Sequence, residues 1–215
     1  MSLPIFPRTV ILANGPFPRG EVPLHLLRNA RRIICCDGAA NRLADNLPEV
    51  EPTWIVGDMD SLREDLKARF GDRIVRMEEQ ETNDLAKAFR FCCSRRWHYL
   101  SILGLTGGRE DHSLGNLSHL VDFAEDGVVM ALTDEGIFTP VCGSTEFCSF
   151  PGQQVSIFSF QPHVRIYSDG LKYPLDNVPF TRWWQATLNE AISGSFKLVF
   201  EGGPLLVFQS YGGHA

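Results

Sequence analysis

Apolar runs and helix-spaced apolar residues alternate along the first 136 residues of the chain. The runs are short and rich in β-branched residues, which is typical of buried strands, and several are stopped by glycine. The predicted strands are residues 9–13, 32–36, 53–56, 73–77, 99–103 and 128–132. The predicted helices are residues 23–30, 39–46, 62–70, 82–93 and 113–124. This alternation predicts a parallel sheet with helices on both faces.

Two of the predicted helices carry a well-defined apolar face. In residues 82–93 that face consists of Leu85, Ala88, Phe89 and Cys92. In residues 113–124 it consists of Leu114, Leu117, Val121 and Ala124. Ser113 is the predicted N-cap of the second helix, because a serine hydroxyl accepts a hydrogen bond from a free amide at a helix start. Both faces are expected to pack against the sheet.

The pattern changes after Gly136, where short runs of β-branched and aromatic residues follow one another. These predicted strands are residues 146–150, 154–160, 164–167, 196–200 and 205–209. Turn residues such as Pro151–Gly152 and Asp169–Gly170 separate them, and no helical stripe is present. The sequence therefore predicts two domains: a Rossmann-like α/β domain over residues 1–136 and an all-β domain, a β-sandwich, over residues 137–215.

Composition and charge narrow the class of protein. A hydrophobic content of 44% and a charged content of 21% are those of an ordinary globular chain. The net charge of −6 argues against binding to nucleic acid, which needs a basic surface. No apolar run approaches the length of a membrane span, and the N-terminal segment lacks the features of a secretory signal. The six cysteines form no CxxC pair, so free thiols in the cytoplasm are expected.

Two carboxylates follow the strand predicted at residues 53–56. Within the stretch IVGDMDS, Gly57 ends the apolar run, and Asp58 and Asp60 come next. Ligands of open α/β sheets lie outside the carboxyl ends of the strands, so these acids are well placed for binding. Carboxylates held close together need a cation or a shared proton, and Mg²⁺ prefers oxygen ligands. The pattern predicts a metal site, with an ordinary acidic turn as the alternative.

A third acid, Asp84, lies in the first turn of the helix predicted at residues 82–93. We interpret it as a further metal contact, with Lys87 on the same helix face to meet a phosphate. The alternative is structural, because a carboxylate in the first turn favours the helix dipole and an i,i+3 ion pair contributes only about 0.2–0.5 kcal/mol. Asp37, followed by small residues, ends the strand at residues 32–36, either to let a ligand approach or to form a tight turn.

The loop from Gly104 to His112 joins a predicted strand to a predicted helix. Its glycines expose backbone amides ahead of a helix N-terminus, an arrangement that binds phosphate. Arg109 adds a planar set of donors for phosphate oxygens, and the acid Asp111 is consistent with a bound cation. His112 contacts phosphate or base, or serves as a capping residue. The chain has no Walker A motif and no GxGxxG after a strand, so the usual P-loop and dinucleotide interpretations fail.

Five sequence blocks, taken in order, resemble the thiamine pyrophosphokinase family. They are DGAANRL at residues 37–43, GDMDS at 57–61, ETNDLAKA at 81–88, GGREDH at 107–112 and SDGLKYPL at 168–175. Each block alone is weak, but the ordered set covers most of the chain. The resemblance implies an N-terminal α/β domain, a C-terminal β-sandwich and a homodimer. It also implies an enzyme that transfers diphosphate from ATP to thiamine with Mg²⁺ and releases AMP.

The resemblance also implies site residues. Its metal-site acids are Asp58, Asp60, Asp84 and Asp111. Its nucleotide residues are Asp37, Gly38, Ala39, Thr82, Gly107, Gly108, Arg109, His112 and Asn116. Its thiamine residues in the β domain are Thr187, Asn189 and Trp184. Leu188 and Val207 depart from the family pattern, and we weigh stacking of thiamine on Trp183 or Trp184 against a place for both in the sandwich core.

Charge stabilisation and proton transfer define the catalytic roles expected of these residues. Arg109 and Lys87 are expected to stabilise the negative charge that moves from donor to acceptor. Either Asp58 or Asp111 is expected to accept the proton of the thiamine hydroxyl. The alternative enzyme is a Mg²⁺-dependent phospho- or nucleotidyltransferase that acts on another small alcohol. The alternative from a different class is a non-catalytic module that senses thiamine or a nucleotide.

Overall fold

The computed structural model describes residues 9–213, which fall into two compact units, one ending at Asp134 and the other beginning at Glu135. The first unit alternates strands and helices. Its strands are β1 (Thr9–Leu12), β2 (Arg32–Cys36), β3 (Trp54–Gly57), β4 (Ile74–Arg76), β5 (Tyr99–Leu103) and β6 (Val128–Leu132). Its α-helices are α1 (Glu21–Asn29), α2 (Ala39–Asn46), α3 (Glu64–Arg69), α4 (Asp84–Ser94) and α5 (Glu110–Phe123).

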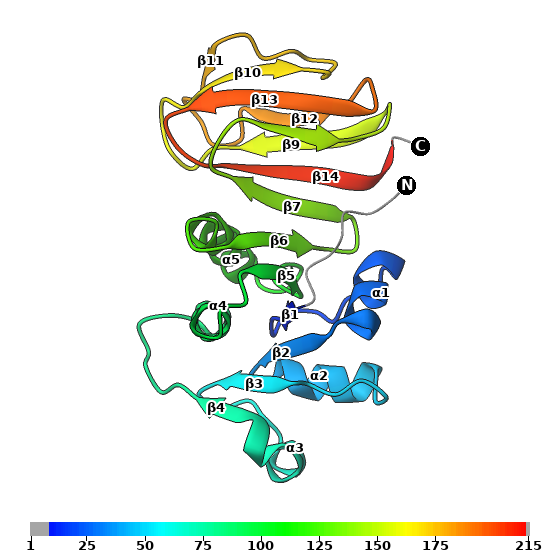
Figure 1. Ribbon diagram of the computed structural model, residues 1–215, viewed down its shortest axis with the longest axis vertical. Coiled ribbons are helices and arrows are strands. Elements are labelled where there is room, and N and C mark those ends of the chain that lie inside the picture. The colour runs from blue at the N-terminus through cyan, green and yellow to red at the C-terminus, as the bar shows by residue number, and fades with distance from the viewer. Residues whose placement is uncertain (1–8, 214–215) are drawn as a thin grey trace. The chain divides into compact units, whose positions relative to one another are not determined.

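The strands of the first unit form a parallel sheet in the order β6-β5-β1-β2-β3-β4. The chain builds outward from β1 to β4 and then restarts on the other side of β1 with β5. Right-handed crossovers therefore place α1 and α2 on one face of the sheet and α4 and α5 on the other, as Figure 1 shows. The predicted α/β architecture is confirmed, and the reversal between β1 and β5 is a topological switch point, where such sheets bind ligands.

Burial explains why these segments fold as they do. Ile11, Ile34 and Ile102, within β1, β2 and β5, are fully buried. The predicted apolar face of α4 is buried through Leu85, Ala88, Phe89 and Cys92. The helix begins at Asp84, because the Asn83 side chain caps it by accepting a hydrogen bond from the Ala86 amide at 3.0 Å.

The start of α5 differs from the prediction. The helix begins at Glu110, so Ser113 lies inside it instead of at its N-cap, and the Ser113 hydroxyl donates to the Arg109 carbonyl at 3.1 Å. Acidic residues in the first turn favour the helix dipole and extend the helix toward its N-terminus. The predicted apolar face was also wrong in part, since Leu114 is 50% exposed. The buried residues of α5 are Leu120, Val121 and Phe123.

The second unit consists of two antiparallel sheets around an apolar core. Their strand orders are β12-β9-β14-β7 and β11-β10-β13-β8. The strands are β7 (Gly136–Val141), β8 (Thr145–Cys148), β9 (Gln153–Phe158), β10 (Arg165–Asp169), β11 (Val178–Pro179), β12 (Ala186–Glu190), β13 (Ser195–Glu201) and β14 (Leu205–Gly213). Val155 and Ile157 of one sheet and Ile166 and Leu198 of the other are fully buried in this core. The predicted β-sandwich is confirmed.

Strands β7, β11 and β12 of the second unit were not predicted. Gly136 and Pro140 weaken the strand pattern of β7, and β11 has only two residues. The pairing of β12 with β9 changes register between Ala186 and Asn189, and such a bulge interrupts the alternation that marks a strand.

The sequence led us to expect free thiols and no membrane span, and the cysteines and the helices bear on these two expectations. Cys35, Cys36 and Cys92 are buried, Cys93 is half-buried, and Cys142 and Cys148 are exposed. Among the helices of residues 9–213, none has both the length and the apolar character that crossing a membrane requires.

Candidate active site

The candidate active site lies at the switch point between β1 and β5. The backbones that leave these two strands pack directly on each other, and the Gly15 amide donates to the Gly104 carbonyl at 3.0 Å. A Cβ atom on Gly15 would lie 2.2 Å from that carbonyl oxygen, so only glycine fits there. The close approach holds the carboxyl ends of β1 and β5 at one place.

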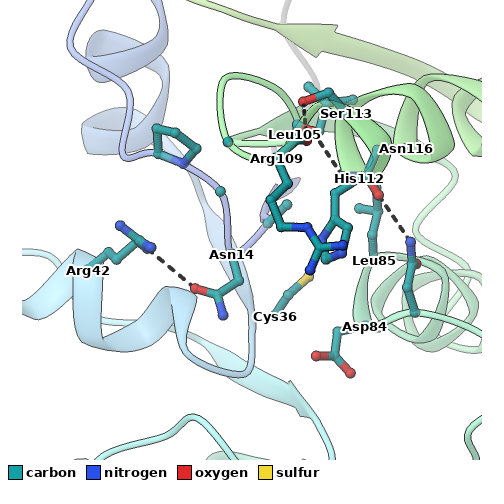
Figure 2. Close-up of a pocket in the computed structure, with 15 residues that line it drawn as sticks. Asn14, Cys36, Arg42, Asp84, Leu85, Leu105, Arg109, His112, Ser113 and Asn116 are labelled. Atoms are coloured by element: carbon teal, nitrogen blue, oxygen red, sulfur yellow. Dashed lines mark hydrogen bonds between the residues drawn. The ribbon is translucent and has the colours of Figure 1, made fainter.

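A pocket of about 480 Å³ opens at this place, within the range of small-molecule sites. Figure 2 shows its walls, which come from the segments after β1 and β5 and from α2, α4 and α5. The residues that line it are Ala13, Asn14, Gly15, Pro16, Cys36, Arg42, Asn83, Asp84, Leu85, Leu105, Gly108, Arg109, His112, Ser113 and Asn116.

Three carboxylates meet beside this pocket. Asp37 follows β2, Asp58 follows β3, and Asp84 opens α4; one oxygen atom from each lies within 4.8 Å of the others. Gly57 makes this approach possible, because a Cβ atom there would lie 2.9 Å from the Asp37 Cβ and 3.2 Å from the Asp84 Oδ1. We call Asp37, Asp58 and Asp84 the acid cluster.

The environment of Asp37 fits a cation. Its side chain is buried, and its Oδ2 accepts a hydrogen bond from the Ser61 amide at 2.9 Å. Its Oδ1 is also buried, but within residues 9–213 it has no hydrogen-bond partner. A buried carboxylate oxygen without a donor is costly, and a bound cation would remove that cost.

Lys87 partly compensates the acid cluster. Its side chain is buried on α4, and its Nζ forms an ion pair with the Asp84 Oδ1 at 3.2 Å. Burial raises the pKa of Asp84, and the nearby Asp58 and Asp37 raise it further, whereas Lys87 lowers it. One buried ammonium faces three carboxylates, so the cluster retains an excess of negative charge. All three offer oxygen ligands, which suits a hard divalent ion such as Mg²⁺.

Two of the four predicted metal acids lie outside the acid cluster. Asp60 is exposed, and its backbone amide donates to the Asp58 Oδ1 at 3.1 Å. Asp111 is exposed and forms an ion pair with Arg109, whose Nη2 lies 2.6 Å from the Asp111 Oδ2. This pairing lowers the pKa of Asp111. The structure thus brings Asp58 and Asp84 together with Asp37, which was predicted as a nucleotide residue.

The predicted nucleotide residues divide between the pocket wall and its surroundings. Those that line the pocket are Gly108, Arg109, His112 and Asn116. Asn116 of α5 links that helix to the start of α4 and to the loop after β5. Its Oδ1 accepts from the Asn83 Nδ2 at 3.0 Å, and its Nδ2 donates to the Leu105 carbonyl at 2.9 Å. Those that do not line it are Asp37, Gly38, Ala39, Thr82 and Gly107. The Thr82 hydroxyl instead donates to the Glu79 Oε1 at 2.6 Å.

The predicted thiamine residues lie on β12 and in the turn before it. Asn189 is buried, and its side chain bonds both the amide and the carbonyl of Tyr173, at 3.1 and 2.7 Å. Thr187 is half-buried. Trp183 and Trp184 are 46% and 52% exposed, so neither belongs to the sandwich core. Both line a second pocket of about 400 Å³.

Several pocket residues were missed at the level of the sequence. Asn14 and Gly15 were interpreted only as a turn after the first strand, and Arg42 and Leu85 only as parts of helices. Asn14–Gly15 stands where the first strand ends, which is the signal that points to a binding site. Cys36 also lines the pocket, but burial raises the pKa of its thiol well above the usual value, so it is neutral.

Two family models match the chain. The model described as "Thiamin pyrophosphokinase, catalytic domain" matches residues 24–132, and that described as "Thiamin pyrophosphokinase, substrate-binding domain" matches residues 136–208. The chain belongs to the thiamin pyrophosphokinase family. It is therefore an enzyme of that family, as the sequence blocks predicted, and its acid cluster lies within the segment matched by the catalytic model.

Individual relatives agree with this family. Thiamine pyrophosphokinase 1 of Oryza sativa is 32% identical over 196 aligned residues, which cover 78% of this chain and 74% of that protein. Thiamine pyrophosphokinase of Bacillus subtilis is 26% identical, with 74% and 78% covered. The crystal structure of thiamin pyrophosphokinase from Geobacillus thermodenitrificans has a TM-score of 0.76 at 22% identity and covers 95% of this chain and 97% of that one. The Candida albicans structure has a TM-score of 0.78 at 18% identity, covering 94% and 88%. At these identities the two structures show a shared fold.

Proposed function

We propose that this enzyme transfers a diphosphate group from ATP to the hydroxyl of thiamine and releases AMP, using Mg²⁺. The observation that supports it most is the acid cluster beside a pocket at the switch point of the sheet. A triphosphate and a divalent ion need such a pairing of oxygen ligands with an open, phosphate-accessible cavity. We further propose that the enzyme works in the cytoplasm as a homodimer.

We propose that Asp37, Asp58 and Asp84 hold the Mg²⁺ ion, with Asp60 as a further acid of the site. The unpartnered Asp37 Oδ1 supports this assignment, because a bound ion gives it a positive neighbour. When bound, the ion would neutralise charge on the phosphate oxygens. Lys87 keeps Asp84 in place through its buried ion pair and offsets part of the negative charge on the cluster.

Arg109 and one acid are proposed for the transfer itself. Arg109 lines the pocket and offers a planar guanidinium to the charge that develops on the transferred group. Either Asp58 or Asp111 is proposed to accept the proton of the thiamine hydroxyl.

Thiamine is proposed to bind the second unit. Trp184 and Thr187 supply contacts, and Asn189 positions them by tying β12 to the Tyr173 backbone. The exposure of Trp184 supports a stacking role, which is worth roughly 0.5–2 kcal/mol for a cationic ring.

The direct test incubates the chain with ATP, Mg²⁺ and thiamine and measures AMP and thiamine diphosphate. We expect both products in equal amounts, and neither when a chelator removes the metal. A panel of other small alcohols distinguishes the alternative enzyme, because formation of ADP would indicate transfer of a single phosphoryl group. An absence of thiamine-dependent ATP consumption would favour a non-catalytic sensor.

Asp60→Asn tests the proposed further acid. We expect AMP formation to be nearly abolished with the fold retained, because Asp60 is exposed and its loss disturbs no buried contact. Near-normal turnover would remove Asp60 from the site.

A further inference from the structure

Two guanidinium groups lie on different sides of the pocket, and their surroundings differ. Arg42 comes from α2, and Arg109 precedes α5 (Figure 2). Arg109 already has an anionic partner, because its Nε and Nη2 donate to the two oxygens of Asp111 at 3.1 and 2.6 Å. The carboxylate of Asp111 therefore occupies one edge of this guanidinium and balances its charge, which leaves the remaining donors of Arg109 for a phosphate.

Arg42 has no such partner. Its Nε donates to the Oδ1 of Asn14, a neutral amide, at 3.4 Å, and within the described part of the chain no carboxylate forms an ion pair with it. Its side chain is exposed, so its charge is available to a ligand. Arg42 is therefore a pocket cation whose charge is not balanced by a neighbouring acid.

The position of Arg42 is set by the end of β1. Asn14 lies at the carboxyl end of that strand, and its amide sits against the backbone of Gly38. A Cβ atom on Gly38 would lie 2.8 Å from the Asn14 Nδ2, so glycine leaves the room that this amide occupies. Asn14 in turn holds the Nε of Arg42 at the pocket wall, and among residues 9–213 no hydrogen bond occupies the other guanidinium nitrogens.

The charge of the site favours a further cation of this kind. Asp84 of the acid cluster lines the same pocket, and one buried ammonium, Lys87, compensates it only in part. A polyphosphate entering beside these carboxylates is repelled unless positive charge meets it away from the metal. Arg42 supplies that charge from a different element, with the fork of donors that matches phosphate oxygens.

We propose that Arg42 binds the phosphates of the nucleotide and that Asn14 is the positioning residue that orients it. This inference rests on the proposed use of ATP. It adds a residue of α2 to the loop before α5 as a source of phosphate contacts, and Arg109 of that loop also pairs with Asp111.

The test compares Arg42→Gln with the wild-type full chain by calorimetric titration of ATP and of inorganic tripolyphosphate. We expect both affinities to fall about 10- to 100-fold, as for loss of a charge-assisted hydrogen bond. The inhibition constant of adenosine against ATP should stay unchanged, since adenosine has no phosphate. The ATP and tripolyphosphate affinities of Arg42→Lys should lie between those of the wild type and Arg42→Gln. Arg28→Gln is the matched control, because Arg28 is an exposed arginine of α1 outside the pocket, and its affinities should equal those of the wild type.

Asn14→Ala tests the positioning role through a double-mutant cycle. We expect Asn14→Ala to weaken ATP binding in the wild-type background but to add nothing in the Arg42→Gln background. Both changes remove the same contact, the hydrogen bond between Asn14 and Arg42. Losses that simply multiply would show that Asn14 acts independently and would overturn its role.

Two results would overturn the role of Arg42. One is an unchanged affinity for tripolyphosphate in Arg42→Gln, and the other is an equal loss for ATP and adenosine, which would indicate a general change of the pocket. These outcomes are separate from failure of the proposed function. A wild-type chain that binds ATP but forms no AMP with thiamine would remove the proposed reaction, while the binding comparison still decides on Arg42. A wild-type chain that binds neither ATP nor tripolyphosphate would remove both.

Discussion

Single side chains in this site are held by specific contacts and by unusual backbone conformations. Asp37 adopts a positive φ of 40°, which directs its carboxylate back toward the end of β3, where the Ser61 amide binds it. Aspartate tolerates such a backbone better than most residues. The acids after β2 and β3 were readable from the sequence, and Asp58 was predicted as a metal ligand, but Asp37 was predicted only as a nucleotide residue. The conformation that turns Asp37 into the cluster was not readable, because it depends on contacts with residues far along the chain.

Replacement of Asp58 is the first prediction at this scale. Asp58→Asn keeps an oxygen that can accept the Asp60 amide, so the turn should persist, but it removes a charge from the acid cluster. We expect kcat for AMP formation to fall about 10²- to 10³-fold, the usual cost of one preorganised charge contact. Asp65→Asn, at an exposed ion pair with Arg63, should leave kcat unchanged. Equal rates for Asp58→Asn and the wild type at saturating Mg²⁺ would contradict the metal role.

The raised pKa of Asp84 gives a pH prediction. Its causes are burial first and the neighbouring acids after it, offset in part by Lys87. A carboxyl with a higher pKa in the folded state binds a proton that the unfolded chain has already lost. In metal-free protein this group therefore lowers the free energy of unfolding as pH rises above its ordinary value of 3.8.

The measurement compares wild type with Asp84→Asn by urea unfolding between about pH 4 and pH 6, with a chelator present. The free energy of unfolding of the wild type, minus that of Asp84→Asn, should decrease as pH rises. Subtracting the variant matters because Glu79, whose pKa is lowered to about 2, contributes with the opposite sign. Added Mg²⁺ should reverse the trend, since it favours the ionised carboxylate. A pH-independent difference would show that burial of Asp84 has no net effect.

At the scale of elements, prediction succeeded where burial is strong and failed where charge or edges decide. The strands β5 and β6 have the predicted bounds, because most residues of each are buried and a glycine adjoins one end, Gly104 after β5 and Gly127 before β6. The start of α5 was misplaced, since its first turn is stabilised by acids and not by an apolar stripe. Strands β7, β11 and β12 of the second unit were not predicted. Breakers in β7 and the bulge in β12 mask the alternation of apolar and polar residues, and β11 has only two residues.

The turn after β3 provides the prediction at this scale. Gly57→Ala should push Asp37 and Asp84 apart, because the new Cβ would lie 2.9 Å from one side chain and 3.2 Å from the other. We expect Mg²⁺ affinity, measured by calorimetry with ATP present, to fall at least about 10-fold, a loss comparable to that of a displaced charge contact. Gly71→Ala is the control, since a Cβ there meets no atom within 4 Å. Unchanged affinity in Gly57→Ala would mean that the cluster does not need its present spacing.

At the scale of the first unit, strand order explains which acids meet. Asp37 and Asp58 follow β2 and β3, which are neighbours in the sheet, and Asp84 returns to them at the start of α4. Asp111 comes after β5, which is separated from β3 by β1 and β2, so the carboxyl ends of β5 and β3 lie on the order of 14 Å apart. A sequence shows which acids follow strands, but the order of strands depends on pairing over the whole sheet. The sequence blocks implied a cluster of Asp58, Asp60, Asp84 and Asp111. Without the strand order, the sequence could not show that Asp37 joins Asp58 and Asp84 instead.

The two units lead to the last prediction, which concerns where each substrate acts. Hydrogen exchange of the full chain should show protection on adding ATP and Mg²⁺ in the segments 14–16, 83–85 and 105–116, because these line the pocket of the first unit. Thiamine should instead protect residues 181–190, where Trp184 is exposed. At ligand concentrations about 100 times Kd, bound amides gain up to about 2.7 kcal/mol, enough to slow exchange well beyond error. Arg28→Gln should behave as wild type, whereas Asp58→Asn should lose the metal-dependent part of the first pattern only. If ATP and Mg²⁺ protected residues 181–190 and left 14–16 unchanged, the nucleotide would have to bind the second unit, and the acid cluster would need another explanation.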